Sequence, residues 1–176
     1  MNRIELIDKI QSKEDKVVKY VYQMKSDGVI SEVSYIDNNT NKDIICCSTH
    51  SGCQCGCRFC FLTDFSNKIK TRPLTSMEIF ETISETYKNQ NLPNENRILL
   101  VSFMGCGEPL ENDYLSSSML EIKKKFKPCR FAVATLIPRH NWMKFFFLVE
   151  DIYFGELIKK TQLLLRTVMQ VRKIVC

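Results

Sequence analysis

Residues 51–60 read Ser51-Gly52-Cys53-Gln54-Cys55-Gly56-Cys57-Arg58-Phe59-Cys60, and the rest of the chain is organised around this segment. Its cysteines at 53, 57 and 60 have the spacing C-x3-C-x2-C. Three thiolates on one short loop can bind three irons of a 4Fe–4S cluster, whereas electron-transfer clusters are closed by four cysteines. An iron without a cysteine is free to bind a substrate or cofactor. The spacing therefore predicts a cluster that takes part in chemistry.

The same thiols allow a second interpretation, a structural zinc site. Zinc takes four ligands, commonly from two C-x2–4-C pairs that are well separated in sequence. Cys57 and Cys60 form one such pair. The second pair would have to come from nearby thiols, namely Cys46, Cys47, Cys53 and Cys55.

The composition is that of an ordinary globular protein. The 176 residues are 44% hydrophobic and 26% charged, enough for a domain with a core. No apolar run is long enough to cross a bilayer, and residues 1–5 do not resemble a signal segment, so we expect a cytoplasmic protein. Nine cysteines in a reducing compartment indicate metal or redox chemistry. A net charge of +5 permits a polyanionic partner without requiring one.

Before the cysteine loop, the hydrophobic pattern predicts four short elements. Residues 3–12 place their apolar side chains on one helical stripe, which predicts a short helix. Residues 17–24 and 29–36 alternate around the turn Ser26-Asp27-Gly28, which is typical of a β-hairpin. Residues 44–47 form an apolar strand that leads into the loop.

After the loop, helical and strand patterns alternate. Thr75 and Glu78 form a capping box at a helix start. The full set of expected elements is helices at 75–89 and 114–126, strands at 97–103 and 131–137, and further helices from about 138. Such alternation predicts an α/β fold with about three parallel strands, preceded by the short helix and the hairpin. We expect two parts, 1–43 with the helix and hairpin, and 44–176 with the α/β core and a divergent helical end.

Several segments together resemble one family. The cysteine loop resembles the radical-SAM signature, and its surroundings are similar to the ribosomal-RNA adenine methyltransferases of the RlmN/Cfr type. The matching segments lie within about residues 17–137: Glu32-Val33-Ser34-Tyr35-Ile36 beside E-x-V-Y-I, Cys46 seven residues before Cys53, Arg72-Pro73-Leu74 with Glu78-Ile79, and Met104-Gly105-Cys106-Gly107-Glu108-Pro109-Leu110-Glu111-Asn112 beside M-G-M-G-E-P-L-x-N.

The resemblance implies a partial radical-SAM (β/α) barrel with a 4Fe–4S cluster and S-adenosylmethionine as cofactors. Cys53, Cys57 and Cys60 would be the cluster ligands, and Phe59 would shield the cluster. Gly105, Gly107 and Glu108 would bind the cofactor, since glycine lets its backbone approach and a carboxylate accepts hydrogen bonds from an ammonium group. In this family the cluster's electron cleaves the sulfonium to a 5′-deoxyadenosyl radical.

The resemblance also implies roles outside the cluster. Glu32 would take the adenine proton, and Cys46 would resolve a covalent RNA adduct. The expected partners are ribosomal RNA or tRNA, and a reducing electron donor such as flavodoxin or ferredoxin.

The sequence departs from the family after about residue 137. The family's chain is considerably longer, Ala134 stands where a cofactor-contacting serine is common, and the surroundings of Cys176 do not match the methyl-carrying cysteine. Three interpretations stay open: an RNA-modifying radical-SAM enzyme, a truncated inactive remnant or a radical-SAM enzyme with another substrate, and a zinc-binding module. We expect cluster binding without completed methyl transfer, and self-association through an exposed sheet edge.

Overall fold

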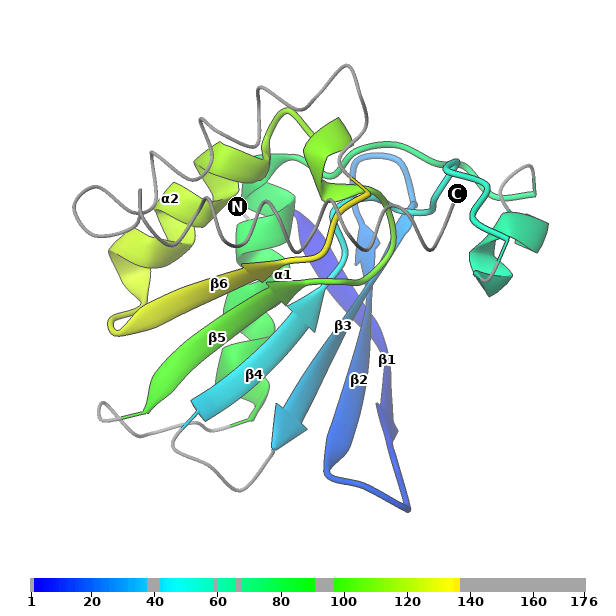
Figure 1. Ribbon diagram of the computed structural model, residues 1–176. Helices are drawn as coiled ribbons and strands as arrows, with labels where there is room; N and C mark the ends of the chain where they lie inside the picture. The colour runs from blue at the N-terminus through cyan, green and yellow to red at the C-terminus, as the bar shows by residue number, and fades with distance from the viewer. Residues whose placement is uncertain (1, 38–41, 59, 66–67, 91–96, 137–176) are drawn as a thin grey trace.

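The computed structural model describes residues 2–37, 42–58, 60–65, 68–90 and 97–136. These residues form one six-stranded mixed sheet, and both α-helices pack on the same face of it (Figure 1). The predicted α/β class is confirmed. The elements in chain order are β1 (Ile4–Gln11), β2 (Val17–Met24), β3 (Ile30–Asp37), β4 (Lys42–Cys47), the 3-10 turn η1 (Phe61–Phe65), α1 (Ser76–Asn89), β5 (Ile98–Phe103), the 3-10 turn η2 (Pro109–Glu111), α2 (Leu115–Lys125) and β6 (Cys129–Val133).

The strands follow one another across the sheet in sequence order. β2 and β3 form the predicted hairpin, whose turn uses Gly28 at a φ of 75°. β4 pairs antiparallel with β3, and β5 and β6 then add in parallel, so the three predicted parallel strands are present. Because parallel strands end at the same edge of a sheet, the loops after β4 and β5 lie together, where α/β proteins place ligands.

The predicted helix at residues 3–12 is wrong, because this segment is strand β1. It pairs antiparallel with β2, and the register shifts between Leu6 and Asp8, which marks a β-bulge. Only Ile4 of the strand is buried, while Leu6, Ile7 and Ile10 are each more than 40% exposed. A helix at this position would need an apolar surface against which to pack its apolar stripe. The free edge of β2 instead offers backbone hydrogen bonds to a strand. Pairing with that edge therefore outweighs the local helical pattern.

The core lies between the sheet and the two helices. Alternate residues of the strands point into it, as the strict alternation of buried positions in β2 shows. The largest fully buried side chains come from every layer: Tyr20, Tyr22, Phe103, Ile4, Met24, Ile45, Leu74, Ile79, Ile83, Met119, Ile122 and Val33. The hydroxyl of Tyr22 shares a hydrogen bond of 2.9 Å with Thr86 on α1, so even the polar tip of this core residue is satisfied.

Helix α1 begins with the predicted capping box. The amide of Glu78 donates to the Thr75 hydroxyl at 3.3 Å, and the amide of Thr75 donates to the Glu78 carboxylate at 2.8 Å. Helix α2 ends with Lys123, Lys124 and Lys125, whose positive charges interact favourably with the negative C-terminal end of the helix dipole. The helices predicted from about residue 138 lie outside the described residues.

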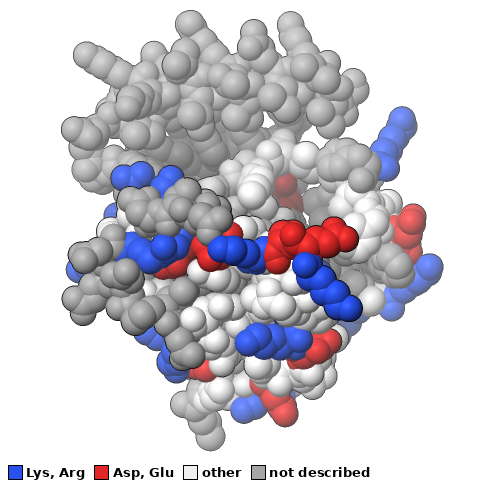
Figure 2. Space-filling model, turned by 90° about the horizontal axis from the view of Figure 1, so that it is seen from below, with Lys and Arg blue, Asp and Glu red and all other residues white. Residues whose placement is uncertain are grey.

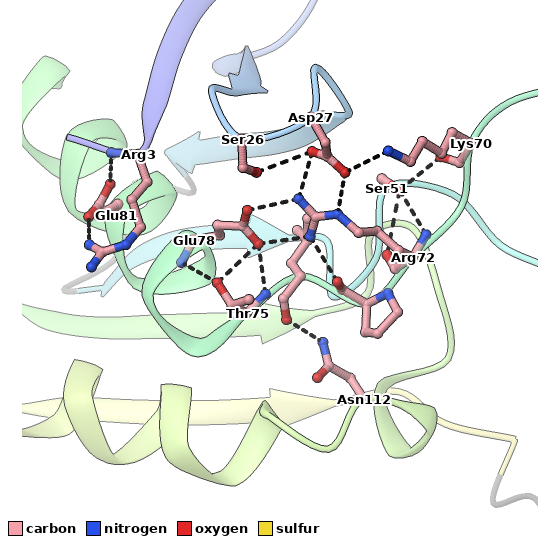
Figure 3. A network of polar contacts seen from close by, with 12 residues as sticks. Arg3, Ser26, Asp27, Ser51, Lys70, Arg72, Thr75, Glu78, Glu81 and Asn112 are labelled. Atoms are coloured by element: carbon pink, nitrogen blue, oxygen red, sulfur yellow. Dashed lines mark hydrogen bonds and ion pairs between the residues drawn. The ribbon is translucent and has the colours of Figure 1, made fainter. Parts of the chain in front are cut away.

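Arg72 joins three separate segments through two carboxylates (Figure 3). Its guanidinium donates to both oxygens of Asp27 in the β2–β3 turn, at 2.8 and 2.9 Å. It also donates to both oxygens of Glu78 on α1, at 2.9 and 2.8 Å. Such bidentate, charge-assisted bonds are among the strongest in proteins. The hairpin, the end of the cysteine loop and the helix are thus fastened at one point.

The ion pairs shift the pKa values of all three groups. Hydrogen bonds from Arg72 lower the pKa of Asp27 far below its ordinary value. Burial alone would raise the pKa of Glu78, but the hydrogen bonds from Arg72 and Thr75 lower it overall. The two carboxylates raise the pKa of Arg72. All three therefore stay charged across the neutral range.

The surface carries charges of both signs. Figure 2 shows basic and acidic side chains interspersed on the face seen from below. Within the described ranges, the helices are too short or too polar to cross a bilayer.

We predict that Arg72→Ala destabilises the fold by about 3 kcal/mol, because it leaves Glu78 buried without its cation. Folding lowers the pKa of both carboxylates. Their contribution to the free energy of unfolding is therefore complete above their pKa of about 4 in the unfolded chain, and it is lost as the pH falls through their lower pKa values in the folded protein. The difference from wild type should therefore narrow below about pH 4. Denaturant unfolding of both proteins at several pH values measures this.

The matched control is Lys88→Ala, which removes the exposed pair between Lys88 and Glu85 on α1. Exposed pairs of this kind contribute little, so we expect a loss of no more than about 0.5 kcal/mol. Equal losses for the two variants would contradict the role given to Arg72.

Candidate functional site

The cysteine loop leaves the sheet after β4 and returns before α1, and its two ends are bonded to each other. The amide of Leu74 donates to the carbonyl of Thr49 at 2.9 Å, and the amide of Ser51 donates to the carbonyl of Arg72 at 3.0 Å. His50 and Pro73 form an isolated antiparallel bridge between them. The loop that carries the thiols is therefore closed at its base like a short hairpin.

The turn after β5 lies directly against this base. The amides of Thr49 and His50 both donate to the carbonyl of Cys106, at 3.0 and 3.1 Å. The hydroxyl of Ser48 accepts from the amide of Cys106 at 3.0 Å and donates to the carbonyl of Glu32 at 2.9 Å. The structure thus brings the base of the cysteine loop, the Gly-Cys-Gly-Glu-Pro turn and the start of β3 together at one edge of the sheet.

Asn112 is a residue whose role sequence reasoning missed. It is buried, and its side-chain amide donates to the carbonyls of Thr49 at 2.6 Å and Leu74 at 2.9 Å. Its side-chain oxygen accepts from the amide of Tyr114 at 2.8 Å. One side chain therefore links both ends of the cysteine loop to the turn after β5. The sequence signal was its place as the last member of the Met104–Asn112 motif.

Two glycines of the turn have no room for a side chain. A Cβ on Gly105 would lie 2.6 Å from the Ser48 hydroxyl and 2.8 Å from the Ser48 amide nitrogen. Gly107 has a φ of +96°, and a Cβ there would lie 2.2 Å from the His50 ring. Burial lowers the pKa of His50, and its Nδ1 is 3.0 Å from the Thr49 hydroxyl. His50 is thus a hydrogen-bonded loop residue that packs against Gly107.

Glu108 is buried and bonded within the protein. Its carboxylate accepts from the amides of Leu110 at 3.2 Å and Leu136 at 2.8 Å, and also from the hydroxyl of Thr135. These bonds cap η2 and tie the turn to the segment after β6. A carboxylate has about four acceptor sites, so these donors leave capacity for a further one.

The three predicted ligands, Cys53, Cys57 and Cys60, are half-buried on the loop, whereas Cys55 is exposed. Burial raises the pKa of Cys57, and the nearby thiols of Cys53 and Cys60 raise it further. Three soft thiols suit iron or zinc. Within the part of the chain that the structure describes, however, no three metal-binding side chains are assembled into a ligand set. Phe59 lies outside the described residues.

Glu32 and Cys46 lie on the face of the sheet opposite the helices. Ser34 pairs with Cys46 across β3 and β4, and Glu32 follows one step nearer the edge that carries the cysteine loop. The carboxylate of Glu32 forms an exposed ion pair with Lys19 at 2.9 Å. Burial raises the pKa of Cys46, while a hydrogen bond with the backbone of Met104 lowers it.

Comparison with known proteins confirms the resemblance that the motifs predict. A probable dual-specificity RNA methyltransferase RlmN of Finegoldia magna is 36% identical over 107 residues, which cover 61% of this chain and 28% of the relative. A probable enzyme of the same name from Lachnoclostridium phytofermentans is 32% identical over 108 residues, 60% of this chain and 27% of the relative. The dual-specificity RNA methyltransferase RlmN of Sulfurimonas denitrificans is 34% identical over 110 residues, 62% of this chain and 30% of the relative.

The chain thus spans less than a third of the length of these relatives, and it is similar to them over about 60% of its own length. No family model matches the sequence.

We predict that Gly107→Ala destabilises the protein by about 3 kcal/mol, because the new side chain adds backbone strain and a clash with His50. Gly56→Ala is the matched control, since Gly56 also has a positive φ of 65° but nothing within 4 Å of an added Cβ. It should cost only the strain, about 1 kcal/mol. Thermal unfolding of the two variants compares them, and equal losses would mean that the contact with His50 does not matter.

We also predict that Asn112→Ala loosens the cysteine loop, because the backbone carbonyls of Thr49 and Leu74 each lose a hydrogen bond. Limited proteolysis should then cut after Lys68 or Lys70 several times faster than in the wild type. Lys124→Ala, at an exposed pair with Glu121 on α2, should leave that rate unchanged. An unaltered cleavage rate in Asn112→Ala would show that the base is held without this side chain.

Proposed function

We propose that this chain is a radical-SAM-type protein, similar in its chemistry to the RNA methyltransferases that it matches. It would bind a 4Fe–4S cluster through Cys53, Cys57 and Cys60, and S-adenosylmethionine beside the turn at residues 105–108. The observation that carries the proposal is the double hydrogen bond from Thr49 and His50 to the carbonyl of Cys106. It holds the base of the thiol loop against the turn that would bind the cofactor.

The donor set supports a cluster with an open iron, because the loop offers three suitably spaced thiols. When bound, the cluster supplies the electron that cleaves the cofactor's sulfonium. The protein's part is to bind and orient. Gly105 and Gly107 would let the cofactor approach the backbone at the strand end, and Glu108 would accept one further hydrogen bond, from the cofactor's ammonium group. Phe59 would shield the cluster from water.

The fold supports the same proposal. β4, β5 and β6 would be the first strands of a partial (β/α) barrel, with the cysteine loop and the turn at their carboxyl ends. Residues 1–43 would form an N-terminal part, and 44–176 the barrel part. β1 and β6 form the edges of the sheet in the described residues, and either edge could pair with a second copy.

The relatives' names support RNA as the substrate class. We propose ribosomal RNA, with tRNA as the other substrate, and a cytoplasmic flavodoxin or ferredoxin as the electron donor. As the resemblance implies, Glu32 would accept the adenine proton once its ion pair with Lys19 opens, and Cys46 would resolve a covalent RNA adduct. Both residues lie near the thiol-bearing edge of the sheet, on the face opposite the helices. Because the surroundings of Cys176 do not match the methyl-carrying cysteine of the family, we expect cluster chemistry without completed methyl transfer.

Anaerobic reconstitution with iron and sulfide tests the proposal. We expect about four irons per chain and release of 5′-deoxyadenosine from S-adenosylmethionine after reduction. Cys57→Ala should abolish both results, because it removes a ligand. Cys55→Ala is the matched control on the same loop and should retain them. Stoichiometric zinc with no iron uptake would identify the site as structural instead and end the proposal.

A further inference from the structure

One row of residues crosses the sheet on the face opposite the helices. The strand registers align Lys19 on β2, Ser34 on β3, Cys46 on β4, Ser102 on β5 and Ala132 on β6. The next row lies toward the starts of β4 and β5 and the end of β3, where these strands contribute the apolar residues Ile44, Leu100 and Ile36. Cys46 is therefore flanked by two hydroxyl-bearing neighbours at the polar end of this face.

Ser102 stands out because its hydroxyl is buried without a partner. The residue is 3% exposed, and among the described residues its Oγ is one of three buried side-chain polar atoms without a hydrogen bond. The other two belong to Ser31 and Ser84, which lie on the helix-covered face of β3 and on α1. Buried polar atoms are nearly always satisfied, so each exception asks for an explanation.

We propose that Ser102 is a positioning residue for Cys46, and that its hydroxyl donates a hydrogen bond to the Cys46 sulfur when that sulfur is charged. Paired strands lie about 4.8 Å apart, so side chains opposite each other come within reach by rotation about χ1. A neutral thiol is a weak acceptor, whereas a thiolate is a strong one. The hydroxyl would therefore be unpaired in the neutral form and satisfied in the charged form.

The surroundings of Cys46 make the Ser102 hydroxyl important for the charged form of the sulfur. Burial disfavours the charged form of Cys46, and a hydrogen bond with the backbone of Met104 offsets this in part. Five ionisable groups lie nearby, on the same face, on an adjoining residue or in the adjacent turn. Lys19 and Glu32 neutralise each other at 2.9 Å, Cys47 points to the opposite face, and Arg130 lies one row away on β6. The backbone amide of Cys106, in the adjacent turn, donates to Ser48, and burial raises the pKa of the Cys106 thiol.

The use of this contact rests on the proposed function. A thiolate, not a thiol, is the form in which a cysteine acts as a nucleophile. A group that stabilises the charged sulfur would increase the fraction of Cys46 ready to react at neutral pH. Ser102 would thus act through Cys46 without touching the RNA.

Alkylation of the full-length, metal-free chain by iodoacetamide tests the inference across a range of pH. Peptide mass spectrometry reads Cys46 separately, because fragmentation between Cys46 and Cys47 distinguishes the two. We expect Ser102→Ala to move the midpoint of the Cys46 rate profile upward by about one pH unit. At pH values below both midpoints, Cys46 should then react about tenfold more slowly.

Two comparisons separate this role from a structural one. Ser102→Thr keeps the hydroxyl and should retain the wild-type rate profile of Cys46. Ser102→Val has the shape of the threonine variant but lacks the hydroxyl, so its profile should match that of Ser102→Ala. Ser31→Ala and Ser84→Ala remove the other unpartnered hydroxyls and should leave the profile unchanged. Identical profiles for the Thr and Val variants, or an equal shift in Ser84→Ala, would overturn the inference. Because the assay contains neither iron nor cofactor, failed iron uptake would end the proposed function and leave this result intact.

Discussion

The guanidinium of Arg72, held between Asp27 and Glu78, fixes the geometry on which the rest of the site depends. It fastens the end of the cysteine loop to the hairpin turn and to the start of α1. A loop of more than twenty residues between β4 and α1 would otherwise have many conformations, and closing it costs entropy. Because Arg72 is fixed, its backbone carbonyl can accept from Ser51, and the base of the loop closes. The ion pairs thus fix the two ends of the loop that carries the thiols, although they contact none of the thiols.

The parallel pairing of β4 and β5 supplies the second constraint. Their carboxyl ends lie at one edge, so the chain that leaves β4 meets the chain that leaves β5 within hydrogen-bonding distance. The close approach requires glycine at 105 and 107, and the side chain of Asn112 donates to the carbonyls of Thr49 and Leu74 at the two ends of the loop. This arrangement explains why the thiol spacing and the Gly-Cys-Gly-Glu-Pro segment, though nearly fifty residues apart, behave as one unit.

The sequence predicted those features that local chemistry decides. The hairpin has its own turn residues, α1 its own capping box, and the buried strands their own apolar runs. β1 was missed because its outcome depends on the free edge of β2, which no local pattern reveals. Spacing identified Cys53, Cys57 and Cys60, and resemblance identified the other candidate residues. The hydrogen bonds made by Ser48, Asn112 and Asp27 could not be predicted from either. Each of these residues bonds to segments far away in sequence, so its role exists only once the chain is folded.

The two faces of the sheet carry different kinds of residues. One face is covered by α1 and α2, and its buried residues are largely apolar, which suits stability. The other face ends, at the edge near the thiols, in a lysine, a glutamate, two serines and Cys46. Polar groups that are half-buried beside apolar ones cost stability unless they have partners. Lys19 and Glu32 pair with each other, whereas the buried hydroxyl of Ser102 has no partner. The cost at Ser102 is therefore offset when the Cys46 sulfur beside it carries a charge and accepts its hydrogen bond.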